Sequence, residues 1–249
     1  MGTVVLERDG AVAVMTLSSP GVKNALTGDM GERIVELCAQ IDADPTVGAL
    51  VVLGAGGTFC SGADTRTWGS NEDPAGAEAF GRTSAVYGAF TRVGELKVPT
   101  VAAVRGAAVG AGLNLALATD LRVVADDARL IGGFLRAGIT PGGGFFTLMA
   151  RRVGPEAAVA LGLFAQELSG ARAAALGLAW ESVPDAEVEE RAMALAAGAA
   201  RDPELVRRAL AVARMELGAF GMPWTAALET ERGTQMWAQR RRQLAKMEP

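Results

Sequence analysis

Residues 106–121 read GAAVGAGLNLALATDL, a glycine-rich turn followed by an apolar helix of small residues and then by a new strand. Turns of this kind place bare backbone N–H groups where a ligand can reach them, and a helix N-terminus favours negative charge. Asn114 is the polar side chain on the first full turn of the helix, and an amide does not act as an acid or a base near neutral pH. The stretch therefore predicts a site that stabilises charge without a proton-transferring side chain beside it.

Strands and helices alternate on either side of this stretch. TVVLER and AVAVMTL are two alternating segments joined by Asp9-Gly10, a strong hairpin signal. Buried strands are expected at residues 49–53, 98–104 and 121–125. Between them, helices are expected over 75–93 and over a segment with Met30, Ile34, Leu37, Cys38 and Ile41 on one face. This order predicts an α/β protein with parallel crossover units rather than a sandwich.

The chain changes character at about residue 144. Beyond it the sequence is rich in Ala, Leu and Arg and predicts helices, with one further candidate strand, LAWESV, at 178–183. The helices are expected to start near Pro155, Pro184, Pro203 and Pro223. The final helix, about 223–243, ends in the basic run RRRQLAK.

Composition excludes several classes of protein. The 249 residues carry a net charge of −4, which argues against nucleic acid as the main partner. No apolar run reaches the roughly 18 residues that span a bilayer, and the N-terminus begins as an alternating strand rather than a signal peptide. Two cysteines, Cys38 and Cys60, make no disulfide framework, so we expect a cytoplasmic protein.

The sequence contains no histidine. This removes Ser-His-Asp and Cys-His nucleophile systems, histidine general bases and histidine metal ligands together. No metal site is expected, and any proton transfer must fall to Asp, Glu, Lys, Tyr, Cys or the substrate. Cys60 has no neighbouring base in sequence, so we interpret it as a small core residue rather than a nucleophile.

Three glycine-rich stretches each follow an expected strand: GAGGTFCSGAD (54–64), RGAAVGAGLN (105–114) and AGITPGGGFF (137–146). A dinucleotide-binding turn needs G-x-G-x-x-G entering a helix, but residues 54–59 lack the third glycine and poor helix formers follow them. The Gly-Lys-Ser/Thr of a phosphate-binding P-loop is also absent. Neither nucleotide motif explains the three stretches.

Together with SPGVKNALTGDM (19–30) and ERGTQMWAQRR (231–241), these stretches resemble, in order and spacing and essentially from end to end, the crotonase family, the enoyl-CoA hydratase/isomerase group. The resemblance implies a ClpP/crotonase-like spiral of ββα turns followed by a helical trimerisation segment. We therefore expect one structural unit, with a core over 1–190 that holds the thioester site and a helical oligomerisation segment over 191–249. The expected assembly is a homotrimer or a dimer of trimers. The resemblance further implies a coenzyme A thioester as substrate, no permanently bound cofactor and a place in fatty acid metabolism.

The resemblance also implies a set of site residues. The thioester carbonyl would sit between two backbone N–H donors, those of Ala63 and Ala111, which form an oxyanion hole. Lys23, Ala25 and Leu26 would line the nucleotide end of the ligand. Further substrate-contacting positions are Ser61, Gly62, Asp64, Thr65, Tyr87, Gly110 and Pro141.

The two glutamates that handle water in hydratases of this family have no counterpart in this sequence. Asn114 stands at the first position and Phe134, counted back from Pro141, at the second. Some relatives carry an aspartate just after that proline, where this sequence has Gly142. A positioned acid or base contributes about 10²–10⁴-fold in rate, so water addition is poorly supported.

Several roles remain open from the sequence. Asn114 either hydrogen-bonds water, a substrate carboxylate or the acyl group, or is a polar relic satisfied by backbone. Asp64 is either a turn or cap residue, which we favour, or a base, and Tyr87 is either a wall, which we favour, or a donor. Arg240, Arg241, Arg242 and Lys246 either reach phosphates or form a solvated helix end.

Two functions fit these features. One is an enzyme acting on CoA thioesters, such as a lyase, decarboxylase, isomerase or impaired hydratase, that uses the oxyanion hole. The other is a non-catalytic acyl-CoA binding or delivery protein. We favour the enzyme, of lyase or isomerase type, because both oxyanion motifs are present.

Overall fold

The computed structural model describes residues 2–67, 73, 76–216 and 224–246. Its largest sheet contains the strands β1 (Thr3–Asp9), β2 (Val12–Ser18), β3 (Ala49–Gly54), β4 (Thr100–Val104), β6 (Leu121–Ala125) and β9 (Glu181–Val183), side by side in that order. The first two pair antiparallel, whereas the neighbours from β2 to β9 run parallel. The prediction of an α/β protein with parallel crossovers is confirmed.

The hairpin and the buried strands lie where the sequence predicts them. Asp9 pairs with Val12, which leaves Gly10, at a φ of 57°, and Ala11 to make a tight turn. Every residue of β4 is buried, as in a parallel sheet that is covered on both faces.

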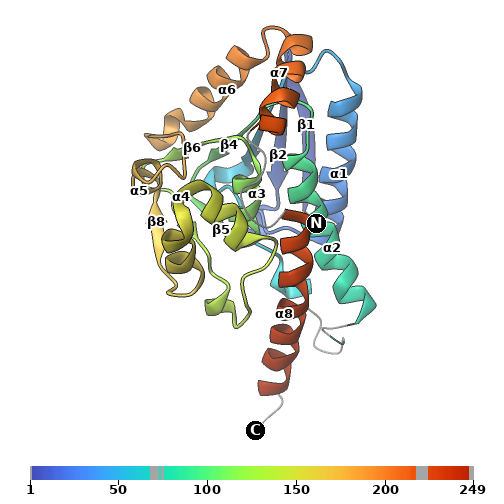
Figure 1. Cartoon of the computed structure of the whole chain (residues 1–249), viewed down its shortest axis with the longest axis vertical. Helices are drawn as coiled ribbons and strands as arrows, with labels where there is room; N and C mark the ends of the chain where they lie inside the picture. Colours follow the sequence, from blue (N-terminus) through green and yellow to red (C-terminus); the bar gives the residue numbers. More distant parts are fainter. Residues whose placement is uncertain (1, 68–72, 74–75, 217–223, 247–249) are drawn as a thin grey trace.

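Helices cover the sheet from both sides (Figure 1). Helix α1 (Gly28–Ala43) begins where Thr27 Oγ1 accepts a hydrogen bond from Met30 N at 3.2 Å. Its predicted apolar face is confirmed, since all five residues are buried. Helix α6 (Val188–Ala199) packs against β3, β4 and β6, and Figure 1 shows it on the opposite side of the sheet from α1.

A second, three-stranded sheet carries the glycine-rich stretch 105–114. It pairs β5 (Ala107–Val109) with β7 (Arg129–Ile131) in parallel, and β7 with β8 (Glu167–Ser169) antiparallel. The sequence predicted none of these strands, and β9 is shorter than the expected strand at 178–183. Strands of three residues are too short to show an alternating pattern, so the sequence alone does not reveal them.

The remaining helices are α2 (Ala77–Gly94), α3 (Ala111–Ala118), α4 (Phe145–Gly162), α5 (Gly170–Ala175), α7 (Pro203–Glu216) and α8 (Trp224–Ala245). Pro203 starts a helix as predicted, and Pro155 resumes α4 after non-helical Gly154. Pro223 lies outside the described residues.

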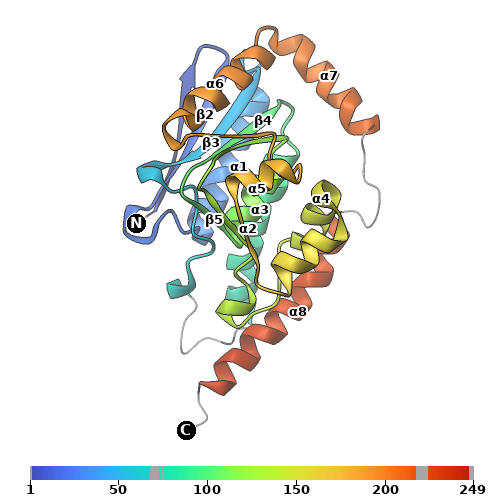
Figure 2. The same ribbon diagram turned by 90° about the vertical axis from the view of Figure 1, so that its left-hand side faces the viewer.

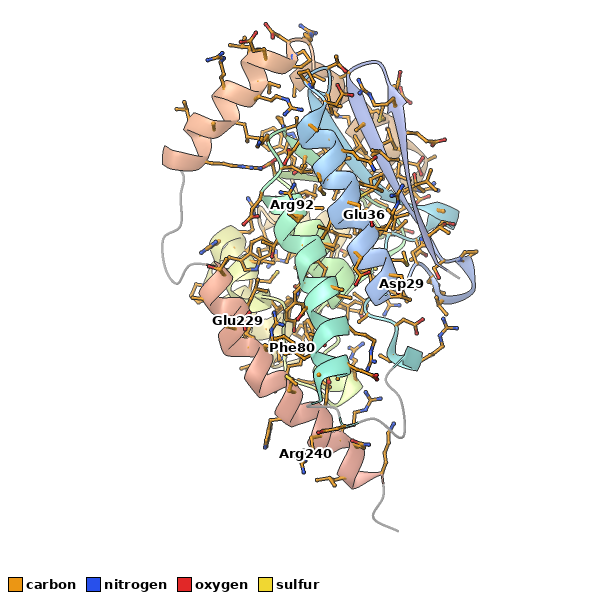
Figure 3. The ribbon with its side chains drawn as sticks, turned by 90° about the vertical axis from the view of Figure 1, so that its right-hand side faces the viewer. Asp29, Glu36, Phe80, Arg92, Glu229 and Arg240 are labelled. Carbon is orange, nitrogen blue, oxygen red and sulfur yellow. The ribbon has the colours of Figure 1, made fainter. Side chains whose placement is uncertain are left out.

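Helix α8 runs alongside α4 (Figure 2) and α2 (Figure 3). In Figure 3, Phe80 of α2 lies between the two helices, and the Arg232 guanidinium of α8 lies 4.3 Å from the centre of its ring. The C-terminal segment is therefore helical, as predicted. The division at residue 190 falls within α6 and stays a prediction.

Candidate functional site

A cavity of about 450 Å³ opens between the ends of β5 and β7 of the second sheet and the helices α2 and α8. Its lining includes eleven of the residues that the sequence singled out: Leu26, Ser61, Gly62, Ala63, Asp64, Thr65, Tyr87, Gly110, Ala111, Asn114 and Phe134. Lys23, Ala25 and Pro141 are not among the lining residues, and Lys23 is exposed. The structure thus brings two glycine turns together with the start of α3.

The two turns meet through their backbones. Cys60 and Ala108 form a parallel bridge, and Val109 N donates to Cys60 O at 3.0 Å. A Cβ atom at Gly62 would lie 3.0 Å from Val109 O and 4.0 Å from Ala111 N. A Cβ atom at Gly112 would collide with the carbonyl oxygen of Cys60. Glycine at both positions therefore allows the close approach, and the sequence had not assigned a role to Gly112.

The N–H groups of Ala63 and Ala111 remain without acceptors in the described part of the chain. Leu26 pairs with Ala63 by donating to Gly62 O and accepting from Asp64 N, each at 2.8 Å, so this pairing does not use the N–H of Ala63. Ala111 is the first residue of α3 and follows Gly110, whose φ is 51°. The first N–H groups of a helix have no partner within it and carry the positive end of its dipole.

Asn114 lies one turn into α3 and is 1% exposed. Its Nδ2 donates to Gly142 O at 2.7 Å, whereas its Oδ1 has no hydrogen-bond partner within the described residues. The amide thus links α3 to the turn at 142–144.

Phe134 forms an apolar wall of the cavity next to the start of α3. It is 7% exposed, and its ring packs edge-on against Phe145 with centroids 5.2 Å apart. A Cβ atom at Gly110 would lie 3.8 Å from the Phe134 ring. This part of the cavity wall is therefore apolar.

Asp64 is the single carboxylate among the described residues that line the cavity. Arg66 holds it through Nε to Oδ1 at 2.9 Å and through Nη2 to Oδ2 at 2.7 Å, and the Arg66 backbone N–H donates to Oδ1 at 3.0 Å. These hydrogen bonds, chiefly those of the guanidinium, lower the pKa of Asp64. The contacts favour the turn role over the base role, because such a carboxylate has little affinity for a proton.

Tyr87 and Gln235 close the cavity from α2 and α8. The Tyr87 hydroxyl donates a short hydrogen bond to Gln235 Oε1, and Gln235 Nε2 lies 3.4 Å from Thr140 O. Burial raises the pKa of the Tyr87 hydroxyl. The sequence pointed to Tyr87 but missed Gln235, for which the only available signal was the family-like motif at 231–241.

Glu231 is a second residue that the sequence missed. Its Oε2 accepts a hydrogen bond from Gly144 N at 2.6 Å, so it caps α4, whose N-cap residue Gly144 has no side chain. Burial raises the pKa of Glu231 to about 7, against the opposing effect of the N–H groups of Gly144, Phe145 and Phe146. Glu231 is not among the residues that line the cavity.

Cationic side chains gather on the cavity lining at Arg82, Arg242 and Lys246. The last two come from the outer end of α8, which Figure 3 marks with Arg240. Arg240 itself is exposed and is not among the lining residues, and the side chain of Arg241 lies outside the described residues. Of the four basic residues of the C-terminal helix, at least two thus face the cavity.

Neither cysteine is poised as a nucleophile. Both are completely buried, and burial raises the pKa of each thiol to about 12. The prediction that they are core residues is confirmed. Among the described residues, no cluster of Cys, Asp and Glu is arranged to hold a metal ion, and no helix there combines the length and apolar character that crossing a membrane requires.

The family model for enoyl-CoA hydratase/isomerase matches residues 7–241. The chain belongs to this family. It is 37% identical over 226 residues to a Mycobacterium tuberculosis protein named "Probable enoyl-CoA hydratase echA14", covering 91% of this chain and 85% of that one. A Rhodobacter capsulatus protein with the name "Probable enoyl-CoA hydratase" is 36% identical over 205 residues, or 81% and 76% of the two chains.

Solved structures share the fold. Pseudomonas aeruginosa OdaA superposes with a TM-score of 0.82 at 28% identity, covering 98% of each chain. An enoyl-CoA hydratase from Polaromonas sp. JS666 gives a TM-score of 0.81 at 23% identity over 98% of this chain and 90% of that one. The predicted crotonase-type fold with a helical C-terminal segment is confirmed.

Proposed function

We propose that the cavity binds an acyl-CoA thioester and stabilises its enolate. The observation that carries this proposal is the pair of N–H groups, Ala63 and Ala111, that have no acceptor in the described part of the chain and belong to residues lining one cavity. Two such donors, one of them at the N-terminus of α3, would hold a thioester carbonyl oxygen and stabilise the negative charge that develops on it.

The rest of the lining suits the two ends of such a ligand. Phe90, Phe134 and Ile139 offer apolar surface to an acyl chain. Arg82, Arg242 and Lys246 offer positive charge to the phosphates of coenzyme A. The family names and the positions of these side chains support the same ligand class.

Classical hydration is not the reaction that we propose. By the sequence resemblance, Asn114 and Phe134 take the positions of the two hydratase glutamates, and the described lining offers one carboxylate, Asp64, that Arg66 already binds. We propose instead a lyase type of step, in which a carbon–carbon bond to the α-carbon of the substrate breaks, as in loss of CO₂, and the electron pair of that bond becomes the enolate. No protein carboxylate then has to remove a proton, whereas an isomerase type of step would need another residue as its base.

A second candidate is acyl-CoA binding or delivery without turnover. The observation in its favour is that the one carboxylate of the described lining, Asp64, is already bound by Arg66. In either case we propose a homotrimer or dimer of trimers, which light scattering on the purified protein would test.

One experiment separates the two functions. The purified protein is titrated by calorimetry with enoyl-, hydroxyacyl- and malonyl-CoA, and each mixture is assayed for products. Binding with turnover of at least one thioester is expected. Tight binding with no product from any of them would establish the binding protein, and absence of binding to all of them would overturn the proposed ligand class.

A further inference from the structure

Asn24 is a buried polar residue to which neither the sequence nor the proposed function assigns a role. It belongs to the family-like stretch at 19–30, is 1% exposed and is not among the residues that line the cavity. Its Oδ1 accepts a hydrogen bond from Ser19 N at 2.8 Å, and its Nδ2 donates to Ala55 O at 2.8 Å and to Thr58 O at 2.7 Å. The amide therefore ties together two backbone segments that are more than thirty residues apart in sequence.

Both amide atoms of Asn24 are committed to these contacts. Exchanging the oxygen and the nitrogen would place an acceptor against the carbonyl oxygens of Ala55 and Thr58, and a donor against the N–H of Ser19. The backbone here is equally constrained, since Lys23 and Asn24 both have left-handed conformations, with φ of 52° and 58°. Such a conformation persists only where surrounding contacts impose it. We therefore interpret the hydrogen bonds of Asn24 as the contacts that hold this turn.

The turn that Asn24 holds is bound directly to the segment that carries Ala63. Lys23 O accepts a hydrogen bond from Ser61 N at 2.9 Å, and Ser61 Oγ donates to Val22 O at 2.7 Å. Both acceptors are backbone carbonyls of the turn itself, so their positions depend on its left-handed conformation. A change in the turn would therefore move the residue that lies two positions before Ala63.

The same pairing determines the direction in which the N–H of Ala63 points. Leu26 donates to Gly62 O and accepts from Asp64 N, each at 2.8 Å, and Ala63 is its partner in a parallel bridge. In a parallel pairing a residue bonds to the neighbours on either side of its partner, so the partner's own N–H points the other way. A slip of one residue would reverse that direction. This register thus leaves the Ala63 N–H for a ligand in the cavity.

We infer that Asn24 is a positioning residue for the oxyanion hole: it fixes the turn before Leu26 and thereby sets the register that leaves the N–H of Ala63 for the thioester carbonyl. This inference rests on the proposed function. It gives Asn24 a role in ligand selectivity in addition to stability. The second donor, Ala111, begins α3 and should remain available when Asn24 is altered.

Paired calorimetric titrations with butyryl-CoA and S-butyl-CoA measure the oxyanion hole. The second ligand is a thioether with a methylene group in place of the carbonyl, so it leaves both N–H groups without an acceptor. The unaltered protein should bind the thioester about tenfold more tightly than the thioether, as two modest hydrogen bonds allow. Equal affinities, or binding of neither ligand, would overturn the proposed oxyanion hole and this inference with it.

Asn24→Asp tests the inference itself. It keeps the size of the side chain and the acceptor for Ser19 N, but it loses the donor to Ala55 O and Thr58 O. The preference for the thioester should fall to about threefold, because one of the two donors is displaced. The infrared stretch of the bound thioester carbonyl should lie at a higher frequency than in the unaltered protein. An unchanged preference and an unchanged stretch, with a lowered melting temperature, would overturn the inference and leave the proposed function intact.

Thr100→Val is the matched control. Thr100 is also 1% exposed and is not among the lining residues, and its hydroxyl donates to Asp120 Oδ2 at 2.9 Å and accepts from Asp120 N at 2.8 Å. This variant should have a lower melting temperature and keep the full preference, and loss of the preference here would contradict the assignment to Asn24. If Asn24→Asp fails to fold, Ser61→Ala decides, because it removes the hydrogen bond to Val22 O at the same junction. It should narrow the preference, and an unchanged preference there contradicts the inference.

Discussion

Two glycine turns border the cavity, and their backbones serve opposite purposes. At 110–112 the turn begins a helix and leaves the N–H of Ala111 without an acceptor in the described residues. At 142–144 side chains hydrogen-bond to the backbone groups: Asn114 Nδ2 donates to Gly142 O, and Glu231 Oε2 accepts from Gly144 N. Both turns need glycine, at a φ of 51° for Gly110 and 78° for Gly144. On the proposed function, the first turn can bind a ligand because no side chain accepts the N–H of Ala111, whereas side chains occupy the backbone groups of the second turn.

The first turn can be altered by Ala111→Pro, which has the largest expected effect. Proline at the first position of a helix is tolerated, so α3 should form while the N–H is lost. Loss of one oxyanion donor should lower thioester turnover about 10²–10³-fold, as measured by steady-state kinetics together with the melting temperature.

Ala77→Pro is the matched control for this variant. It makes the same change at the first position of α2, and Ala77 is exposed and not among the lining residues. Turnover by Ala77→Pro should stay within about twofold. Equal loss in both variants would show that proline damages the helices and that Ala111 is no donor to the ligand.

The second turn can be altered by Gly143→Ala. A Cβ atom there would lie 2.5 Å from Asn114 Nδ2 and 3.1 Å from Phe90 Cε2, at a φ of 73°. Left-handed strain of about 1–2 kcal/mol and overpacking of about 1–3 kcal/mol should together lower the free energy of unfolding by about 3 kcal/mol, measured by urea denaturation.

Gly56→Ala separates the two contributions, because Gly56 has a φ of 72° with nothing within 4 Å of its Cβ position. It should lose about 1–2 kcal/mol from strain alone. If both variants lose the same amount, side chains do not fill the second turn as tightly as the distances indicate.

This contrast also explains which parts of the molecule the sequence predicts. Local signals suffice for the hairpin at Asp9-Gly10 and for the buried strand at 121–125, because neighbouring residues determine those elements. The turn at 110–112 is predictable for the same reason, since Gly110 and Ala111 lie next to the helix that they start.

The filling of the second turn depends on contacts between distant segments. Glu231 and Gln235 reach it from about ninety residues further along the chain, and helical periodicity on α8 does not reveal which helix it packs against. The free oxygen of Asn114 was equally hidden, because it follows from the position of Gly142 O. Contacts of this kind require the three-dimensional structure.

Glu231→Gln examines the acceptor that caps the second turn. The pKa of Glu231 is raised by burial from 4.5 to about 7, so its contribution to stability is fully present below pH 4.5 and is lost as the pH rises through 7. We compare the free energy of unfolding of the unaltered protein with that of Glu231→Gln. The difference between them should decrease by up to about 3 kcal/mol as the pH rises from 5 to 8. Urea denaturation across this range measures the difference.

Glu156→Gln is the control for that series, because Glu156 is exposed on the same helix that Glu231 caps. Glu156→Gln should change the free energy of unfolding by no more than about 0.5 kcal/mol, as surface substitutions usually do. A Glu231→Gln difference that does not change with pH would mean that Glu231 ionises in the folded protein as it does in water.

Asp64→Asn alters the turn at 61–65, whose neighbour Cys60 pairs with Ala108 just before the first turn, and it has the smallest expected effect. Arg66 is 67% exposed, and pairs with one exposed partner contribute about 1 kcal/mol or less, so the loss of stability at pH 7 should be of that size. Because the hydrogen bonds of Arg66 lower the pKa of Asp64, the loss should disappear as the pH falls through that lowered value. Turnover should decrease by less than tenfold, whereas removal of a general base would reduce it about 10²–10⁴-fold. A decrease of that larger size in Asp64→Asn, with the fold intact by circular dichroism, would make Asp64 the base and place proton transfer beside the first turn.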